Sequence, residues 1–302
     1  MTTTNTCLIT GGSGFIGQHL IPQLLNANYQ ITVLTRFPEK TAKLFKKPIQ
    51  CIETLEQIHD DQTFDAVINL AGQGIADARW SDANKQSIRS SRMSITTALI
   101  TLFQRLNTKP GIFISGSAIG YYGAGIKTNI TETSGTDNSF SSTLCMEWEN
   151  IASQALDLEI RTCILRTGIV LGRNGGALKR MLPPFKFGLG GRIGNGQQWM
   201  SWIHIDDLCN MMLYMIKHND LEGTFNGTAP TPVTNQDFTK SLAKRLHRPA
   251  IFPMPAMVVK LLFGQMGEEL LLAGHQVIPN RILQTDFTFQ YPTLTQALEN
   301  VV

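Results

Sequence analysis

The stretch that decides the fold is TCLITGGSGFIGQHL, residues 6–20. A short apolar, β-branched run leads into a glycine-rich turn, and a helical pattern of apolar residues follows. Three glycines of the turn, Gly11, Gly14 and Gly17, have the spacing G-x-x-G-x-x-G. Gly11 permits a tight turn, Gly14 lets the backbone approach a pyrophosphate, and Gly17 lets the helix lie close to the strand.

The start of the helix offers free N–H groups and the positive end of the helix dipole to phosphate groups. The stretch therefore predicts a dinucleotide site, and the alternative is a glycine turn needed only for packing. The residues that we expect to contact the cofactor here are Gly11, Ser13, Gly14, Phe15, Ile16 and Gly17.

The end of the second expected strand indicates which dinucleotide is bound. The sequence there is VLTRFPEK, residues 33–40, with Arg36 where an acidic residue would hold the ribose hydroxyl of NAD. A guanidinium suits a 2′-phosphate through charge and paired hydrogen bonds. We therefore expect NADP rather than NAD, and the alternative is that Arg36 is an ordinary surface arginine.

The first half of the chain alternates between strands and helices. Strands are expected at 30–35, 65–72, 111–117 and 161–167, and helices at 81–106 and at about 143–156. Apolar strands that alternate with helices indicate a parallel sheet covered on both faces, an α/β fold of the doubly wound Rossmann type. At the ends of two of these strands we expect further cofactor contacts from Leu70, Ala71, Gly72, Thr167 and Gly168.

Composition changes after Thr167. Eight glycines lie between Gly172 and Gly196, and the last part of the chain is rich in proline. The segment 204–216 predicts a helix with Asp206 as its cap. We expect an NADP-binding Rossmann domain at 1–170, to which segments around 200–228 return, and a small, irregular C-terminal substrate-binding region over most of 171–302.

These motifs resemble the extended short-chain dehydrogenase/reductases, which include nucleotide-sugar epimerases and dehydratases. The resemblance is closer to one atypical branch, the NAD(P)-dependent epimerases of the bacterial sugar-nucleotide-epimerase-like type. Its signatures are NLAGQGIADARW (69–80), SAIGYYG (117–123), LCMEWE (144–149), the long block at 165–208 and RPAIFPMPA (248–256). The resemblance implies a Rossmann-type fold with a small substrate domain, and it implies no particular substrate.

In the wider superfamily a serine and a tyrosine contact the reacting oxygen, and a lysine lowers the pKa of the tyrosine. Ser117 matches the serine, although it could instead cap a turn. By register, Ser141 and Cys145 stand where the tyrosine and lysine should be, so the usual Tyr-x-x-x-Lys pair is absent. Tyr122, and after it Tyr121, could supply a phenol from another direction, or both could be packing residues.

The segment from Ile160 to Ile205 contains no acidic residue and seven basic ones. Cations among glycine loops suit a small anionic substrate, and the alternative is a solvated basic surface with tryptophans in the core. The candidate substrate-binding residues are Arg166, Lys186, Arg192, Gln198 and Trp199. His204 with Asp206 and Asp207 reads as a helix start, so we expect no metal site.

Length, composition and charge limit the kinds of partner that the protein could bind. The chain has 302 residues, 42% hydrophobic content and a formal charge of +3, which do not indicate nucleic-acid binding. The apolar run AMVVKLLFG, residues 256–264, is too short to span a bilayer, so no membrane partner is expected. Five scattered cysteines and no evident signal peptide indicate a cytoplasmic protein. We expect a monomer or a homodimer.

The sequence thus predicts an NADP-dependent oxidoreductase or epimerase-like enzyme. Its substrate would be a small anionic molecule, such as a nucleotide-linked sugar. The rival hypothesis is a catalytically degenerate NADP-binding sensor or interaction protein, which the missing Tyr-x-x-x-Lys pair supports.

Overall fold

A parallel sheet of seven strands forms the centre of the molecule. The computed structural model describes residues 5–173 and 175–302. In spatial order the strands are β10 (Gly223–Gly227), β6 (Thr162–Thr167), β5 (Ile112–Ala118), β4 (Ala66–Asn69), β1 (Thr6–Thr10), β2 (Gln30–Leu34) and β3 (Gln50–Ile52). Every neighbouring pair is parallel. The chain order reverses between β1 and β4, where doubly wound sheets bind ligands, and the predicted Rossmann-type fold is confirmed.

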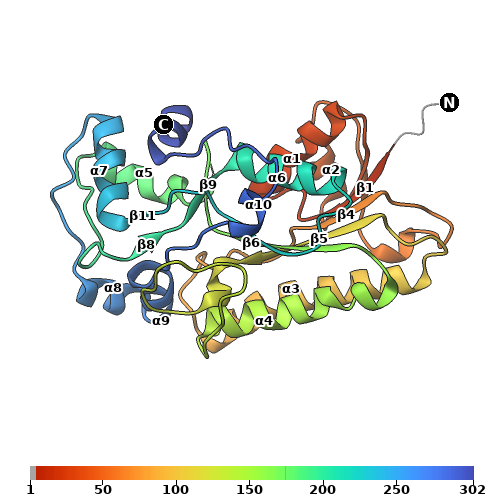
Figure 1. The fold of residues 1–302 in the computed structure, drawn as a ribbon, viewed down its shortest axis with the longest axis horizontal. Helices are drawn as coiled ribbons and strands as arrows, with labels where there is room; N and C mark the ends of the chain where they lie inside the picture. Colours follow the sequence, from red (N-terminus) through yellow and green to blue (C-terminus); the bar gives the residue numbers. More distant parts are fainter. Residues whose placement is uncertain (1–4, 174) are drawn as a thin grey trace.

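Helices cover both faces of the sheet (Figure 1). On one face lie α1 (Phe15–Asn26) and α6 (Ile205–Lys217), and on the other lie α3 (Asp82–Arg105) and α4 (Phe140–Ser153). Successive side chains of a strand point to opposite faces, so Cys7 and Ile9 pack with α1 and α6 while Leu8 packs with α3. Each face therefore has its own apolar core.

The second half of the chain builds a further core around Trp202 and Phe238. Its strands are β7 (Ile169–Leu171), β8 (Trp199–Met200), β9 (Trp202–His204) and β11 (Val233–Thr234), and its helices are α5 (Leu178–Lys186), α7 (Asn235–Leu246), α8 (Ala256–Phe263), α9 (Gln265–Gly267), η4 (Glu268–Leu272), α10 (Asn280–Leu283) and α11 (Leu294–Val301). Shorter helices in the first half are α2 (Pro38–Ala42), η1 (Leu55–Gln57), η2 (Ile119–Tyr122) and η3 (Leu156–Leu158). In Figure 1, α5, α7 and α8 lie at the end of the molecule farthest from β1.

A short backbone ladder ties this second core to the loop that follows β5. The N–H of Gly274 donates to the carbonyl of Gly125 at 2.8 Å, and the N–H of Gln276 donates to that of Lys127 at 2.9 Å. The N–H of Ile130 returns a bond to Gln276 at 2.9 Å. The loop after β5 is thereby held by residues almost 150 positions later in the chain.

Two helix starts differ from the sequence predictions. Helix α4 begins at Phe140 rather than near residue 143, because the Ser139 hydroxyl accepts a hydrogen bond from Ser142 N at 3.3 Å and caps an earlier turn. Asp206 is not the cap of α6. The ring of His204 accepts from Asp206 N at 3.1 Å, so the histidine is the cap.

Candidate active site

Ser117 lies near the carboxyl end of β5, the position expected for a residue that meets substrate. Its side chain is 5% exposed. The hydroxyl donates a hydrogen bond of 2.6 Å to Oε1 of Glu149, which projects from α4. Because its hydrogen is held by the carboxylate, the Ser117 oxygen keeps its lone pairs for another donor.

Glu149 forms a buried ion pair with Arg166 of β6. The guanidinium binds both carboxylate oxygens, Nε to Oε1 at 2.9 Å and Nη2 to Oε2 at 2.8 Å. The two side chains are 5% and 8% exposed, so the pair is withdrawn from water. Burial alone would lower the pKa of Arg166, but the Glu149 carboxylate outweighs burial and raises it.

The two candidate tyrosines both contact this guanidinium. Tyr122 is fully buried, and its hydroxyl accepts from Arg166 Nη1 at 3.0 Å and donates to Asn226 Oδ1 at 2.6 Å. Burial raises the pKa of Tyr122, and Arg166 opposes the rise. The half-buried Tyr121 places its ring centroid 3.2 Å from the Arg166 Cζ atom, a cation–π contact. Tyr121 is thus the better placed of the two for contact with a substrate, against the order that the sequence suggested.

The residues at the missing tyrosine and lysine positions have other partners. Ser141 donates from its hydroxyl to Glu269 Oε2 at 2.7 Å, and its backbone N–H binds the same oxygen at 3.0 Å. Cys145 is buried, and desolvation followed by the nearby Glu149 carboxylate raises its pKa to about 11. The thiol is therefore neutral and unreactive near pH 7.

A cation missed by the sequence analysis lies beside the lysine position. The Arg92 side chain, from α3, is close enough to Cys145 that each affects the pKa of the other. It packs over the Trp148 ring, with Cζ 5.3 Å from the centroid, and approaches Gly72. Burial lowers the pKa of Arg92, and within residues 5–173 and 175–302 no carboxylate pairs with it. Arg92 can therefore supply positive charge where the family's lysine is absent.

The glycine-rich loop has the backbone geometry that a dinucleotide requires. Gly11 has a φ of +72°, and a Cβ on it would come within 2.6 Å of the Leu70 carbonyl. A Cβ on Gly17 would lie 2.5 Å from the Gly12 carbonyl oxygen, so helix and loop are in direct backbone contact. Among the described residues, no side chain caps the first turn of α1, which leaves its N–H groups available to an anion. The loop thus fits a pyrophosphate.

The other expected cofactor residues gather around the same edge of the sheet. Arg36 is exposed just beyond the end of β2, and Leu70 to Gly72 follow β4. Thr167 ends β6, and Gly168 N bonds to Gly227 O at 3.0 Å. These positions share the carboxyl edge with Ser13, Phe15 and Ile16 at the start of α1.

Comparisons with known proteins agree with this geometry. The profile of the NAD dependent epimerase/dehydratase family matches residues 7–226, and that of a domain of unknown function, DUF1731, matches residues 254–301. The chain belongs to the NAD dependent epimerase/dehydratase family. An epimerase family protein of Staphylococcus saprophyticus is 39% identical over 98% of each chain. The chloroplastic SDR39U1 homolog of Arabidopsis thaliana is 36% identical over 98% of this chain and 86% of its own length.

Solved structures of family members align with nearly the whole chain. Human epimerase family protein SDR39U1 (isoform 2), whose structure contains NADPH, shares 32% identity and superposes with a TM-score of 0.88 over 98% of each chain. UDP-glucuronic acid 4-epimerase from Bacillus cereus, in complex with NAD, shares 20% identity at a TM-score of 0.77 over 98% of this chain and 94% of its own. The second likeness concerns the fold alone.

The second half of the chain offers an anionic substrate fewer free arginine and lysine side chains than the sequence suggested. Arg166 already pairs with Glu149, as described above. Lys186 and Arg192 are exposed, and Arg192 Nη1 donates to Gln236 Oε1 at 3.3 Å. Gln198 is 3% exposed and donates its amide to the carbonyls of Ile193 and Leu271, so it braces the C-terminal region, whereas Trp199 is half-buried.

The group of His204, Asp206 and Asp207 has a structural role. His204 Nε2 lies 3.1 Å from Asn300 Oδ1, and Asp207 accepts from the backbone N–H groups of Gln290 and Tyr291 at 2.7 and 3.0 Å. Across the part of the chain that the structure describes, no cluster of three or more His, Cys, Asp or Glu could hold a metal ion.

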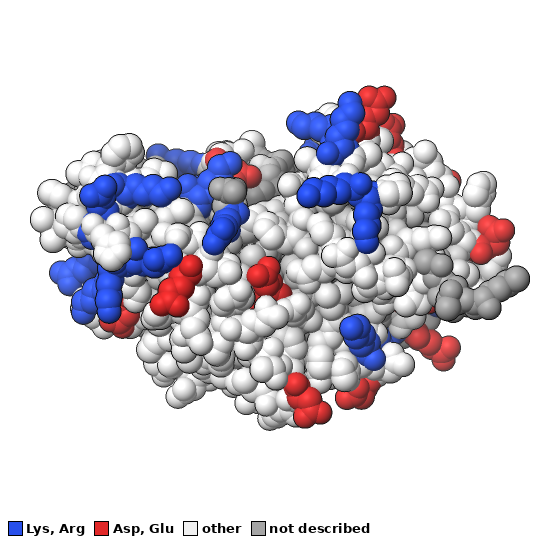
Figure 2. Space-filling view, turned by 90° about the horizontal axis from the view of Figure 1, so that it is seen from above, with Lys and Arg blue, Asp and Glu red and all other residues white. Residues whose placement is uncertain are grey.

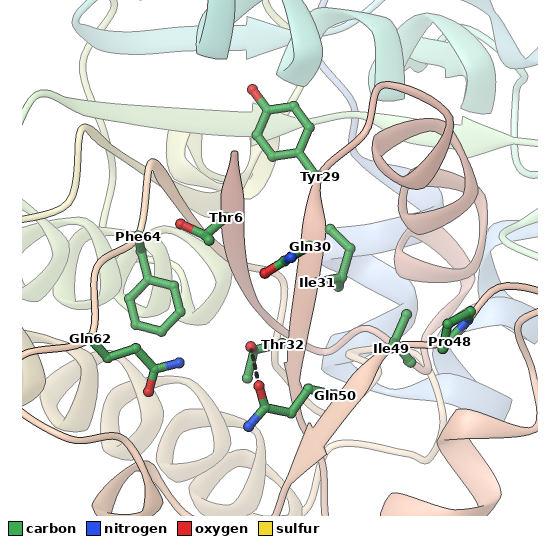
Figure 3. Close-up of a pocket in the computed structure, with 10 residues that line it drawn as sticks. All are labelled: Thr6, Tyr29, Gln30, Ile31, Thr32, Pro48, Ile49, Gln50, Gln62 and Phe64. Atoms are coloured by element: carbon green, nitrogen blue, oxygen red, sulfur yellow. Dashed lines mark hydrogen bonds between the residues drawn. The ribbon is translucent and has the colours of Figure 1, made fainter. Parts of the chain in front are cut away.

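Of two cavities formed by the described residues, the larger lies near the site. A cavity of about 830 Å³ is lined by the loop at Ala124 to Ile126 and by Lys260, Glu269 and Leu272, next to the start of α4. The other, of about 300 Å³, lies where Thr6 and Gln30 begin their strands, at the opposite edge of the sheet from Ser117 (Figure 3). We therefore associate only the larger cavity with substrate.

Proposed function

We propose that this protein is an NADP-dependent oxidoreductase or epimerase that acts on a small anionic substrate, with a nucleotide-linked sugar as one candidate. The observation that supports it best is the 2.6 Å bond between Ser117 and Glu149 beside an intact glycine loop. A relative with 32% identity, human SDR39U1, was crystallised with NADPH. Arg36, at the end of β2, would hold the 2′-phosphate.

The bound nicotinamide would supply hydride exchange with a substrate carbinol or carbonyl carbon. Ser117 would accept the hydrogen of a substrate hydroxyl through a lone pair, while its own hydrogen passes to Glu149 Oε1. In the reverse direction the same two groups would deliver a proton to a substrate carbonyl oxygen. This relay replaces the phenol of the superfamily's tyrosine, and it needs no acidic side chain at Ser141.

Arg92 and Tyr121 would position the substrate. Arg92 brings beside Cys145 and Gly72 a guanidinium that has no carboxylate partner among the described residues, so it can bind a carboxylate or phosphate group of the substrate. Lys186 and Arg192 would attract the anion from farther away. The five free cysteines, of which four are buried, support a reducing, cytoplasmic location.

Turnover of NADPH tests this proposal. Wild-type protein and Ser117→Ala are mixed with NADPH and a panel of nucleotide sugars and carbonyl compounds, and absorbance is followed. We expect Ser117→Ala to slow turnover by about a hundredfold or more while NADPH affinity stays unchanged. Ser153→Ala is the matched control, because that hydroxyl only donates to the Glu149 backbone carbonyl.

A second candidate, an NADP sensor without catalysis, is favoured by the high pKa of Cys145 and the burial of Tyr122. Tight NADPH binding with no change of absorbance across the panel would support the sensor. Absence of NADPH binding by calorimetry would exclude both.

A further inference from the structure

An exposed apolar surface covers α8 and the segments beside it, at the end of the molecule away from β1. Its side chains are between 38% and 83% exposed. We call this set the α8 surface, and its members are Phe187, Leu189, Ile251, Phe252, Met254, Met257, Val258, Leu261 and Leu262. None of them belongs to the candidate active site.

Two segments that are distant in the sequence meet next to the start of α8. Phe252 N donates to Gly190 O at 3.1 Å, and Met254 N donates to Arg192 O at 2.9 Å, so residues 187–192 run beside residues 249–254. Helix α8 follows directly from this ladder at Ala256. Residues 187–192, residues 249–254 and the start of α8 are therefore neighbours in the fold.

Helix α8 exposes most of its apolar side chains to solvent. Met257 and Leu261 are one turn apart and are 83% and 75% exposed, and Val258 and Leu262 repeat this spacing beside them. Of its eight residues only Val259 is buried. A surface helix normally turns its apolar side inward, so a cluster of exposed apolar residues of this kind marks an interaction site.

Basic residues border the α8 surface. Lys186 precedes Phe187, Arg248 precedes the 249–254 segment, and Arg192 bonds to Met254 through its carbonyl. All three are exposed, and neither 178–192 nor 238–262 contains an acidic residue. Figure 2, seen from the side opposite α8, shows lysines and arginines gathered at the end of the molecule that holds α5 and α7. Lys260 is a lesser contributor, because it pairs with Glu268 at 2.9 Å.

The basic residues around the α8 surface indicate which kind of partner would bind there. A second copy of the chain meeting this surface would place the same cations opposite one another, and such like-charge contacts are unfavourable. An anionic bilayer accepts both features, because apolar side chains enter the headgroup boundary while lysines and arginines remain at the charged surface. Among the described residues no helix is long and apolar enough to cross a membrane, but a surface contact requires none.

We propose that the α8 surface docks this protein reversibly on anionic lipid membranes. This departs from the expectation of no membrane partner, which rested on the lack of a segment long enough to span a bilayer. Lys186 and Arg192 also have a role in the proposed catalytic function, but Met257, Leu261 and Arg248, which the test changes, have none.

Sedimentation with vesicles tests the proposal. The full chain is mixed with phosphatidylcholine vesicles that either contain or lack phosphatidylserine, and the bound fraction is measured at low and high salt. We expect binding only with phosphatidylserine, weakening as salt rises. Met257→Ser with Leu261→Ser should weaken binding at least tenfold, since both side chains leave water on docking. Arg248→Glu should weaken it more than fivefold.

Leu44→Ser is the matched control, because Leu44 is 45% exposed but lies outside the α8 surface. It should bind vesicles as the wild type does. Equal binding by the Met257/Leu261 variant, or no binding of wild type to anionic vesicles, would overturn the proposal. A wild-type dimer that the same two substitutions dissociate, with no vesicle binding, would assign the surface to self-association instead. Folding is checked by circular dichroism, and these residues are exposed enough for the variants to fold.

Discussion

The buried pair of Glu149 and Arg166 gives the most decisive test of how the site is built. Glu149→Gln keeps the shape of the side chain and removes its charge. The Arg166 guanidinium, 5% exposed, would then be a buried cation with no carboxylate against it. Breaking one side of a buried pair costs about 3–5 kcal/mol in the free energy of unfolding. At roughly 2–4 °C per kcal/mol, the melting temperature should fall by about 6–20 °C.

Helix α4 contains its own control for this experiment. Glu147, two residues earlier, pairs with Arg89, but there the side chains are 35% and 46% exposed. Glu147→Gln should therefore change the free energy of unfolding by only about 0–1 kcal/mol. Urea unfolding of both variants, followed by circular dichroism, measures the two values under the same conditions.

A third variant separates loss of the pair from loss of the site. Adding Arg166→Met to Glu149→Gln removes the stranded cation, so much of the lost stability should return. Activity should not return, since Ser117 would still lack its carboxylate. If Glu149→Gln costs no more than Glu147→Gln, the pair is solvated and our reading of the site is wrong.

Three further outcomes are expected. Arg36→Gln should weaken NADPH binding roughly tenfold to a hundredfold and leave NADH binding unchanged, as measured by calorimetry; an equal loss for both cofactors would contradict the 2′-phosphate contact. Arg92→Met should raise the melting temperature by a few degrees, because burying the charge of Arg92 costs about 1 kcal/mol in the free energy of unfolding. The same variant should slow any turnover that is found. A lower melting temperature would mean that Arg92 is stably paired. Burial lowers the pKa of His275, so as pH falls through about 6.5 the unfolded chain binds a proton that the native state does not bind, and the free energy of unfolding decreases. His275→Gln should therefore flatten the pH dependence of the unfolding midpoint. An unchanged slope would contradict this.

The parallel sheet could be predicted from sequence because its strands are apolar runs with short, sharp borders. The glycine loop carried the strongest signal, since Gly11 needs both a positive φ and a close backbone neighbour. Short strands such as β3 and β8 were missed, because three or two residues give no periodicity to detect.

The interior of the site was less accessible to sequence reasoning. Glu149 was not among the residues expected in the site. Cys145, Trp148, Glu149 and Ala152 nevertheless follow the spacing of one buried helix face. A carboxylate on that face requires a buried cation, which could have pointed to Arg166 in the neighbouring apolar strand. The role of Arg92 depends on the packing of α3 against α4, and no local pattern encodes it.

The pairing of β10 with β6 has a consequence for how this chain acquires its fold. Strand β10 joins the sheet only after the chain has left it at Thr167 and built β7, α5, β8, β9 and α6. Until those residues emerge from the ribosome, β6 presents a bare edge of N–H and C=O groups, which invites pairing with other nascent chains. Pairing of two strands that are so far apart in the sequence is slow. We therefore expect the refolding yield to decline as protein concentration rises.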